Sequence, residues 1–342
     1  MIQVQEDISI VICAYTEKRW HDLVEAVASV QRQTTAYREI IVVIDYNPVL
    51  FRQAQEQLTG VVVVENTQTK GLRGARNSGI AHAQGQIIAF LDDDAVAIPD
   101  WLRFLCEGYT DERVLGTGGA ITPLWAEQKP RWFPEEFYWV VGCTYRGMPQ
   151  EDAIIRNPIG ANMSFRREIF DAVGGFERET ASVGSLHAGG CEETELCIRA
   201  HQVWPQRVFL YHSQANVFHR VPASRTNWHY FWFRCYVEGL AKAAMTQYVG
   251  AKDGLTSEYK YTLQTLPLGV VHGLSDTLRH RDLTGLGRAG AIITGLLTTM
   301  VGYVQGKIAL QQEHLRNAIS KDLPFWKKAT SLIVTTPLDN GI

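Results

Sequence analysis

The sequence has 342 residues, of which 46% are hydrophobic and 20% are charged, and its formal net charge is −3. This length is enough for one large domain or two ordinary ones, and the composition is that of a globular protein with a sizeable core. The small negative net charge gives no reason to expect a nucleic acid as a partner.

Apolar runs alternate with helical patterns over the first ninety residues. Strands are expected at 8–15, 38–45, 61–66 and 87–91, and helices at 20–30, 50–58 and 73–84. This alternation predicts a doubly wound α/β fold with a mostly parallel sheet. Neither GxGxxG nor GxxxxGK[ST] follows the first strand, which argues against an NAD-type site and against a P-loop.

Three consecutive carboxylates, Asp92, Asp93 and Asp94, follow the fourth apolar run. Ligands of open α/β sheets bind at this carboxyl end of the strands. Adjacent carboxylates repel one another, and a divalent cation with a preference for oxygen ligands, Mg²⁺ or Mn²⁺, would neutralise them. The alternative is a solvated acidic turn before the helix that begins near Pro99. These residues alone favour neither interpretation.

The pattern loosens after Val114. Residues 123–149 are rich in aromatic side chains, which fits packing under an irregular connection better than the lining of a cleft. The later elements are helices at 166–173, 191–199 and 227–248 and strands at 208–211 and 215–219, with a Gly- and Ser-rich stretch at 181–190. Carboxylates at the start of the 191–199 helix are favoured by its dipole alone, so capping is an open alternative to a catalytic role for them.

The order of the motifs resembles that of the family 2 glycosyltransferases with the GT-A fold. The resemblance covers about residues 8–240 and is carried by Ile10-Val-Ile-Cys-Ala-Tyr15, Gly74-Ala-Arg-Asn-Ser-Gly79, Phe90-Leu-Asp-Asp-Asp-Ala95, Pro158-Ile-Gly-Ala-Asn-Met163, Gly174-Gly-Phe176 and Glu192-Glu-Thr-Glu-Leu-Cys-Ile-Arg199. It implies a GT-A catalytic domain over 1–224, which binds a nucleotide sugar, and a helical C-terminal region over 225–342.

The resemblance also implies the residues that bind the donor. Ala14 and Tyr15 would lie near the base and the ribose. Asp45 stands where the family has an acid that contacts the base, but Tyr46 replaces the usual second Asp, which leaves open whether the donor is linked to UDP, dTDP or another nucleoside diphosphate. Arg76 matches an arginine on the donor side.

The Asp92–Asp94 segment matches the DxD motif of the family. By this match, Asp92 and Asp93 belong to the donor site, with Asp92 reaching the ribose, and Asp94 ligates the metal, Mn²⁺ or Mg²⁺, that bridges the diphosphate. His219 stands where related enzymes supply a further metal ligand, although a lone His after a strand is more often structural.

Glu193 aligns with the Asp that is the general base of the family. The longer side chain moves the carboxylate by about 1.5 Å, one C–C bond. Glu192 would orient the loop and cap the helix on the acceptor side, where Gly160 and Asn162 would shape the acceptor site.

Together these matches predict a metal-dependent inverting glycosyltransferase. The donor would be a nucleoside diphosphate sugar, and the acceptor a hydroxyl of a glycan, a glycolipid or a glycoside. Three alternatives are a sugar transferase that acts on polyprenyl phosphate at a membrane, a catalytically silent nucleotide-binding module, and, more distantly, a nucleotidyltransferase.

The C-terminal region contains 18 uncharged residues, 289–306, which is near the lower limit of about 17–25 residues for a membrane span. Its glycines and threonines favour a buried or interfacial helix instead, and flanking basic residues favour peripheral contact with an anionic membrane. A homodimer interface and a plain helical cap on the catalytic domain are alternatives.

The six cysteines form no CxxC pair, and the N-terminal residues lack a basic segment followed by an apolar one. We therefore expect reduced thiols and a cytoplasmic location, with the protein peripheral on the inner face of a membrane if the C-terminal contact holds.

Overall fold

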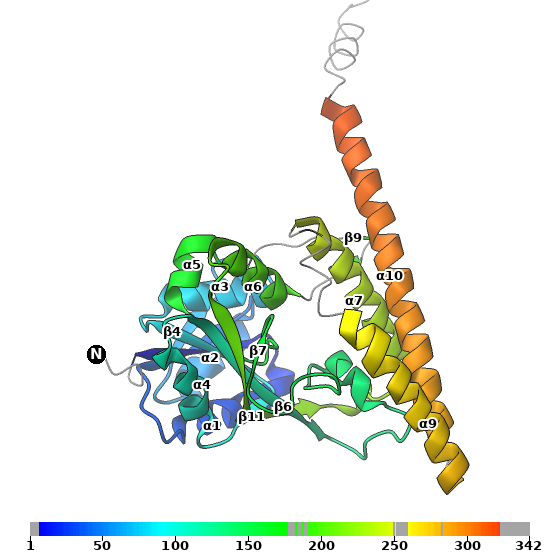
Figure 1. Ribbon diagram of the computed structural model, residues 1–342. Helices are drawn as coiled ribbons and strands as arrows, with labels where there is room; N and C mark the ends of the chain where they lie inside the picture. Colours follow the sequence, from blue (N-terminus) through cyan, green and yellow to red (C-terminus); the bar gives the residue numbers. More distant parts are fainter. Residues whose placement is uncertain are drawn as a thin grey trace, which may run out of the picture.

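The computed structural model describes residues 7–176, 182–183, 186–187, 191–248, 250, 259–281 and 283–321. A curled sheet flanked by helices forms the N-terminal unit, and three long helices stand side by side next to it (Figure 1). Element labels follow Figure 1.

The first half of the sheet is parallel, as predicted. Its strands are β1 (Ile8–Ala14), β2 (Glu39–Ile44), β3 (Val62–Glu65) and β4 (Ile87–Asp92), in the spatial order β3-β2-β1-β4. The connecting helices are α1 (Trp20–Gln31), α2 (Pro48–Gln57) and α3 (Leu72–His82). In β1, Ile10 and Ile12 point into one hydrophobic cluster and Val11 into another, which explains why the strand carries apolar residues on both of its faces.

The second half of the sheet is mixed. Its strands are β5 (Ala95–Ala97), β6 (Val114–Trp125), β7 (Ala153–Ile155), β8 (Asn162–Arg166) and β11 (Val208–Val221). Strand β8 is antiparallel to both β4 and β6, whereas β6 and β11 are parallel. The two strands expected at 208–211 and 215–219 are one strand, β11, whose register against β6 shifts between His212 and Val217.

Strand β6 escaped the sequence pattern because its centre consists of small residues. Gly116, Gly118 and Gly119 replace the apolar side chains that mark a buried strand. A Cβ at Gly119 would lie only 1.8 Å from the carbonyl oxygen of Ala215, so the neighbouring strand leaves room for glycine alone.

Short helices and strands complete the N-terminal unit. They are α4 (Trp101–Glu107), α5 (Arg167–Val173), α6 (Glu192–Val203), the 3₁₀ turns η2 (Glu17–Arg19), η3 (Gly108–Thr110), η4 (Glu135–Val141) and η5 (Ala223–Arg225), and the two-residue strands β9 (Ser182–Val183) and β10 (Leu186–His187). The rest of the 181–190 stretch lies outside the described residues.

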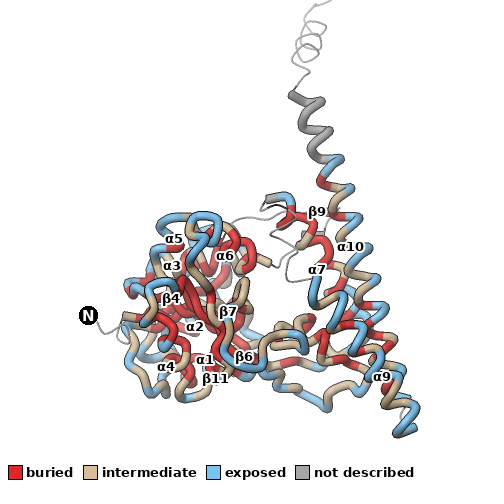
Figure 2. Tube along the Cα trace, viewed as in Figure 1, coloured by how far each residue is buried: buried red, intermediate tan, exposed pale blue. Residues whose placement is uncertain are grey.

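The aromatic segment 123–149 packs into the core. Phe133 and Phe137 are fully buried, and the ring of Trp132 stacks on that of Trp228 with centroids 3.8 Å apart. Phe231, on helix α7 (Trp228–Tyr248), contacts all three of these segment residues edge-on or at a tilt. This cluster joins the sheet unit to the C-terminal helices, as the packing interpretation predicted. In Figure 2, buried residues occur along α7 as well as in the sheet.

The C-terminal part is helical, as expected. A π-helical turn, η6 (Tyr261–Thr265), leads into α9 (Leu266–His280), and α10 (Thr284–Lys321) then runs along both α9 and α7 (Figure 1). Among the described helices, the stretch Thr284–Gln312 of α10 alone is long and apolar enough to cross a membrane, with a mean hydropathy of 1.2 and 33% of its window buried. This is weak evidence, because core helices of soluble proteins pass the same test. The domain boundary between residues 224 and 225 stays a prediction.

Candidate active site

The predicted metal ligands lie together at the carboxyl end of β4. Asp92 is the last residue of this strand, and Asp93 and Asp94 form the turn into β5. Strand β5 pairs with β11 so that Ala95 lies opposite His219, which brings the imidazole to the turn. Asp94 Oδ1 is 3.0 Å from His219 Nε2, and one ligand atom from each of Asp92, Asp94 and His219 lies within 4.8 Å of the others. This geometry could hold a metal ion.

Two arginines contact the same carboxylates. Arg19 Nη1 lies 2.9 Å from Asp93 Oδ1 and 3.1 Å from Asp94 Oδ2, and Arg225 Nη2 lies 3.8 Å from Asp94 Oδ2. Neither arginine was predicted as a site residue. The dipeptide Lys18-Arg19 after β1 was the one available signal, and nothing in the sequence linked Arg225 to the acidic turn.

The electrostatics differ sharply between neighbouring carboxylates. Burial raises the pKa of Asp94, but the hydrogen bond with His219 and the positive charges of His219, Arg19 and Arg225 together outweigh burial and lower the pKa to about 2. Burial and then the Asp94 carboxylate raise the pKa of Asp93 to about 7, although Arg19 opposes the rise. Burial lowers the pKa of His219, but its hydrogen bond with Asp94 raises it to about 10. Asp94 is therefore ionised, and a metal that binds His219 must displace a proton from it.

Asp45 holds the loop that follows β3 in place. Its carboxylate is buried and accepts hydrogen bonds from Asn66 Nδ2 at 2.6 Å and from the backbone nitrogen of Gly71 at 3.0 Å. Tyr46, which replaces the usual second acid, has a left-handed backbone with φ of 48° and donates to the carbonyl oxygen of Gln68 at 2.7 Å. Asp45 thus anchors residues 66–71 in this structure.

Ala14 and Tyr15 end the first strand next to this loop. Ala14 is buried, whereas the ring of Tyr15 is 55% exposed and lies under the Arg19 guanidinium, 5.5 Å from its carbon. An exposed aromatic ring at a strand end offers a stacking surface for a planar base.

Arg76 links the metal side of the site to Glu193. It is buried on α3, and its Nη2 donates to the carbonyl oxygen of Gly160 at 3.1 Å and lies 3.5 Å from Asp92 Oδ1. A Cβ at Gly160 would lie 2.8 Å from the same nitrogen, so glycine leaves the space for the guanidinium. Asp92, Glu193 and Glu192 all stabilise its positive charge, which places Arg76 among three carboxylates.

Glu193 lies in the first turn of α6 and is half-buried. Burial and then the Glu192 carboxylate raise the pKa of Glu193 to about 7, and Arg76 opposes the rise. Glu192 is itself buried, and Glu195 forms an ion pair with Arg199, one turn further along the helix. A pKa of about 7 suits Glu193 to proton transfer near neutral pH.

The Asn162 side chain makes its hydrogen bonds to groups inside the protein. It is fully buried, accepts from Trp101 Nε1 at 2.7 Å and donates to the carbonyl oxygens of Ala120 at 2.9 Å and Ala215 at 2.7 Å. Its side chain can affect an acceptor only by holding α4, β6 and β11 in place around β8.

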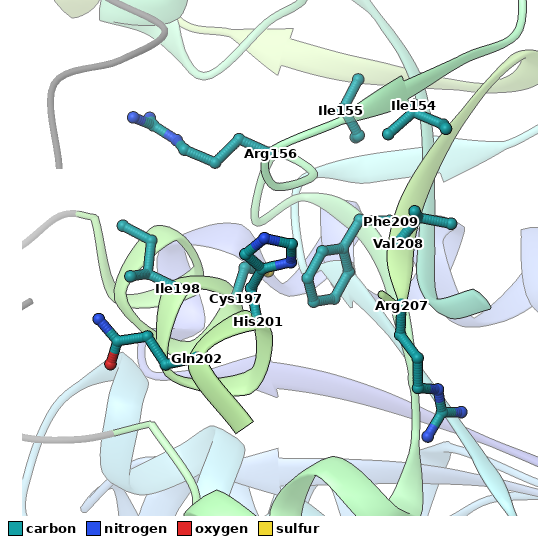
Figure 3. A pocket seen from close by; sticks show the side chains of 10 residues that line it. All are labelled: Ile154, Ile155, Arg156, Cys197, Ile198, His201, Gln202, Arg207, Val208 and Phe209. Atoms are coloured by element: carbon teal, nitrogen blue, oxygen red, sulfur yellow. The ribbon is translucent and has the colours of Figure 1, made fainter. Parts of the chain in front are cut away.

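An apolar pocket of about 320 Å³ lies between α6, β7 and β11 (Figure 3). Cys197 and His201 line it from α6 and follow Glu193 at intervals of one helical turn, which places the pocket on the same face of the helix. Its other lining residues are Ile154, Ile155, Arg156, Ile198, Gln202, Arg207, Val208 and Phe209.

Solved structures share this fold. A mannosyltransferase of Pyrobaculum calidifontis, solved with GDP-Man and Mn²⁺, superposes with a TM-score of 0.57 at 14% identity and covers 89% of this chain and 87% of its own. GalNAc-T7, solved with UDP, GalNAc and Mn²⁺, gives a TM-score of 0.51 at 18% identity over 76% of this chain and 54% of its own. The mixed, mostly parallel curled sheet followed by C-terminal helices is thus the GT-A fold of the glycosyltransferases.

Sequence comparison identifies the family. The model described as "Glycosyl transferase family 2" matches residues 9–174. A glucosyl-dolichyl phosphate glucuronosyltransferase of Haloferax volcanii is 33% identical over 304 residues, which are 87% of this chain and 96% of that protein. An Escherichia coli UDP-Glc:alpha-D-GlcNAc-diphosphoundecaprenol beta-1,3-glucosyltransferase is 31% identical over 98 residues, 28% of this chain and 38% of that protein. The chain belongs to glycosyltransferase family 2 and is a glycosyltransferase.

Proposed function

We propose that the protein moves a sugar from a nucleoside diphosphate sugar to a hydroxyl of a lipid-linked sugar, with inversion and with the help of a divalent metal. The observation that carries this proposal is one charged network: Arg76 connects Asp92, a member of the Asp92–Asp94–His219 cluster, with Glu193. A site for a diphosphate-bound metal and a base near neutral pKa are the two parts that such a transfer needs.

The metal site fits the proposal. Two carboxylates and an imidazole suit a first-row ion such as Mn²⁺ better than Mg²⁺, which prefers oxygen ligands. When bound there, the ion would neutralise charge that grows on the leaving diphosphate. The second Asp93 oxygen is buried and has no hydrogen-bond partner among the described residues, which marks a further acceptor atom for a donor hydroxyl.

Glu193, Arg76 and Tyr15 have different roles in the proposed reaction. Glu193 accepts the proton of the acceptor hydroxyl while the hydroxyl oxygen attacks the anomeric carbon of the donor sugar. The nucleoside diphosphate leaves in the same step, so the reaction is a single displacement that inverts the configuration of the anomeric carbon. Arg76 opposes the rise of the Glu193 pKa, which increases the ionised fraction of this base near neutral pH, and beside Asp92 it would face the donor. Tyr15 and the loop held by Asp45 would receive the base and the ribose.

The relative from Haloferax volcanii supports a polyprenyl-linked acceptor, because its name gives glucosyl-dolichyl phosphate as the molecule that is extended. The apolar pocket on the Glu193 face of α6 suits the apolar part of such an acceptor. Direct transfer to a polyprenyl phosphate stays the alternative. It needs little base catalysis, so the raised pKa of Glu193 favours a hydroxyl acceptor.

Such an acceptor places the enzyme at a membrane surface. The cytoplasmic side of this membrane stays a prediction. A homodimer stays a prediction.

The test measures thermal shifts with UDP, dTDP and GDP and with their sugars, UDP-glucuronic acid and UDP-glucose first, with and without Mn²⁺. A bound ligand raises the unfolding temperature by mass action, so one nucleotide should give a metal-dependent shift. Asp94→Asn should abolish it, and Asp111→Asn, at an exposed ion pair far from the site, should not. Transfer from the same donor to glucosyl-dolichyl phosphate, but not to dolichyl phosphate, would then define the acceptor. A thermal shift that is the same with and without Mn²⁺ and is retained in Asp94→Asn would contradict the proposal.

A further inference from the structure

Helices α9 and α10 bury many small side chains and expose many large apolar ones, although Leu266, Ile292 and Leu310 are also buried. The buried positions of α10 include Gly285, Ala289, Ala291, Gly295, Gly302 and Gly306. Its exposed positions from 286 to 308 are Leu286, Ile293, Thr294, Leu297, Met300, Val301, Val304, Gln305 and Ile308. None of these exposed side chains is charged.

Helix α9 follows the same rule. Gly269 and Gly273 are buried, whereas Leu268, Val271 and Leu274 are exposed, and Leu278 is 81% exposed. Its exposed apolar side chains recur every three or four residues, so they form one stripe along the helix. In Figure 2, exposed residues run along α9 and α10, which lie side by side.

The small residues allow close approach of the helix backbones. A Cβ at Gly302 would lie 2.2 Å from the carbonyl oxygen of Tyr236 on α7, and a Cβ at Gly239 would lie 2.1 Å from that of Thr299. Between α9 and α10, a Cβ at Gly285 would lie 2.2 Å from the carbonyl oxygen of Gly273. Contact through small residues is typical of helices that pack inside a lipid phase, where large side chains face the lipid.

This arrangement is the reverse of an ordinary surface helix. A surface helix of a water-soluble protein turns its apolar stripe to the core and its charges to the solvent. Here the stretch from Leu286 to Ile308 extends for about 33 Å, at a rise of about 1.5 Å per residue, with an uncharged exposed face. Two exposed positively charged residues, Arg279 and Arg281, lie instead at the turn between α9 and α10.

We propose that the exposed apolar faces of α9 and α10, which we call the lipid face, insert into the acyl boundary of a lipid bilayer, with both helices in the plane of the interface. Helix α7 lies behind α10 and carries the ion pair Glu238–Lys242, so lipid cannot surround α10 on all sides and the helix does not span the bilayer. Arg279 and Arg281 suit anionic headgroups at the edge of this face. The inference deepens the proposed function, since it seats the enzyme where a polyprenyl-linked acceptor is found.

The test is flotation of the full-length chain with vesicles of phosphatidylcholine alone and of phosphatidylcholine mixed with phosphatidylglycerol. We expect the protein to float with both, and to remain bound in about 1 M salt, where charge attraction is screened within about 3 Å. The double substitution Leu297→Glu and Val304→Glu should reduce the floating fraction at least tenfold. Val49→Glu, at an apolar position on α2 that is 56% exposed, is the matched control and should float like the unchanged protein.

Three results would overturn the inference. The first is that the unchanged protein does not bind vesicles, and the second is that the double variant floats as well as the control. The third is that the unchanged protein is a dimer without lipid and the double variant is a monomer, which would make the lipid face a contact between two copies. The nucleotide thermal shift of the double variant separates this test from the proposed function, because the donor site shares no residue with the lipid face.

Discussion

Asp94 and Glu193 are both carboxylates of one network, but their surroundings give them opposite properties. Against the effect of burial, the hydrogen bond with His219 and the nearby positive charges lower the pKa of Asp94 to about 2, whereas burial and Glu192 raise the pKa of Glu193 to about 7. A group that stays ionised suits a metal ligand, and a group that titrates near neutrality suits a general base. The separation of these values is the residue-level reason for assigning the two roles.

The first prediction concerns Glu193→Gln. The amide keeps the shape of the side chain but cannot accept the proton, so transfer should fall by about 10²–10⁴-fold. Donor binding, measured by the nucleotide thermal shift, should be unchanged. Glu112→Gln, at an exposed position, serves as the control. Full activity of the Glu193→Gln variant would remove Glu193 as the base.

The second prediction concerns the pH profile. The base acts in its ionised form, so transfer should fall about tenfold per pH unit below the Glu193 pKa of about 7. Arg76 lowers this pKa, so Arg76→Gln should move the acid limb of the profile to higher pH. Rate measurements from about pH 5 to about pH 9 at saturating donor check this, with Arg113→Gln, at an exposed ion pair, as the control. An acid limb that stays in place would show that Arg76 does not act on the base.

At the scale of elements, Asn162 ties β8 to three neighbours. Asn162→Ala would leave Trp101 Nε1 and two buried carbonyl oxygens without partners, each at a cost of about 1–3 kcal/mol. We therefore expect the free energy of unfolding to drop by roughly 3 kcal/mol or more. Denaturant unfolding of this variant and of Gln214→Ala, an exposed position on β11, measures the difference. Equal stability of the two variants would rule out this role.

The contact between α7 and α10 gives a second prediction at this scale. In Gly302→Ala, the new Cβ would meet the carbonyl oxygen of Tyr236 at 2.2 Å, so the helices must separate. Overpacking of this kind costs about 1–3 kcal/mol. In Gly290→Ala the Cβ meets nothing within 4 Å, and alanine should stabilise the helix by about 1 kcal/mol. Thermal unfolding should therefore shift in opposite directions for the two variants, and a common direction would contradict the close packing.

For the whole molecule, the question is whether the C-terminal helices fold separately. Phe231, Cys235, Ala291 and Ile292 belong to the same buried cluster as the strands of the sheet. We therefore expect one cooperative unfolding transition, with circular dichroism and tryptophan fluorescence changing together. Two separate transitions would instead support an independent helical domain after residue 224.

Several features of the fold and the site could be predicted from sequence because they depend on local patterns. Continuous apolar runs mark strands that are buried on both faces. The acidic motifs at 92–94 and 192–193 consist of adjacent residues, so they can be recognised directly in the sequence. Strand β6 was missed because close contact with a neighbouring strand requires glycines where a buried strand usually has apolar side chains. Strand β11 was predicted as two strands because its register against β6 is irregular, which the sequence of β11 alone does not reveal. Arg19 and Arg225 were missed for the same reason: they meet Asp94 from segments 75 and 131 residues away.

The sequence by itself determined the family, the parallel half of the sheet and the identity of the acidic and basic candidates, because these depend on the order of residue types along the chain. Only the tertiary structure decided which of these side chains share a charged network, that the Asn162 side chain makes its hydrogen bonds inside the core, and that α10 buries Gly295, Gly302 and Gly306 while it exposes Leu286, Leu297 and Val304. Contacts between distant segments set burial and local charge, and burial and local charge in turn set the pKa of a carboxylate and the face that a helix presents.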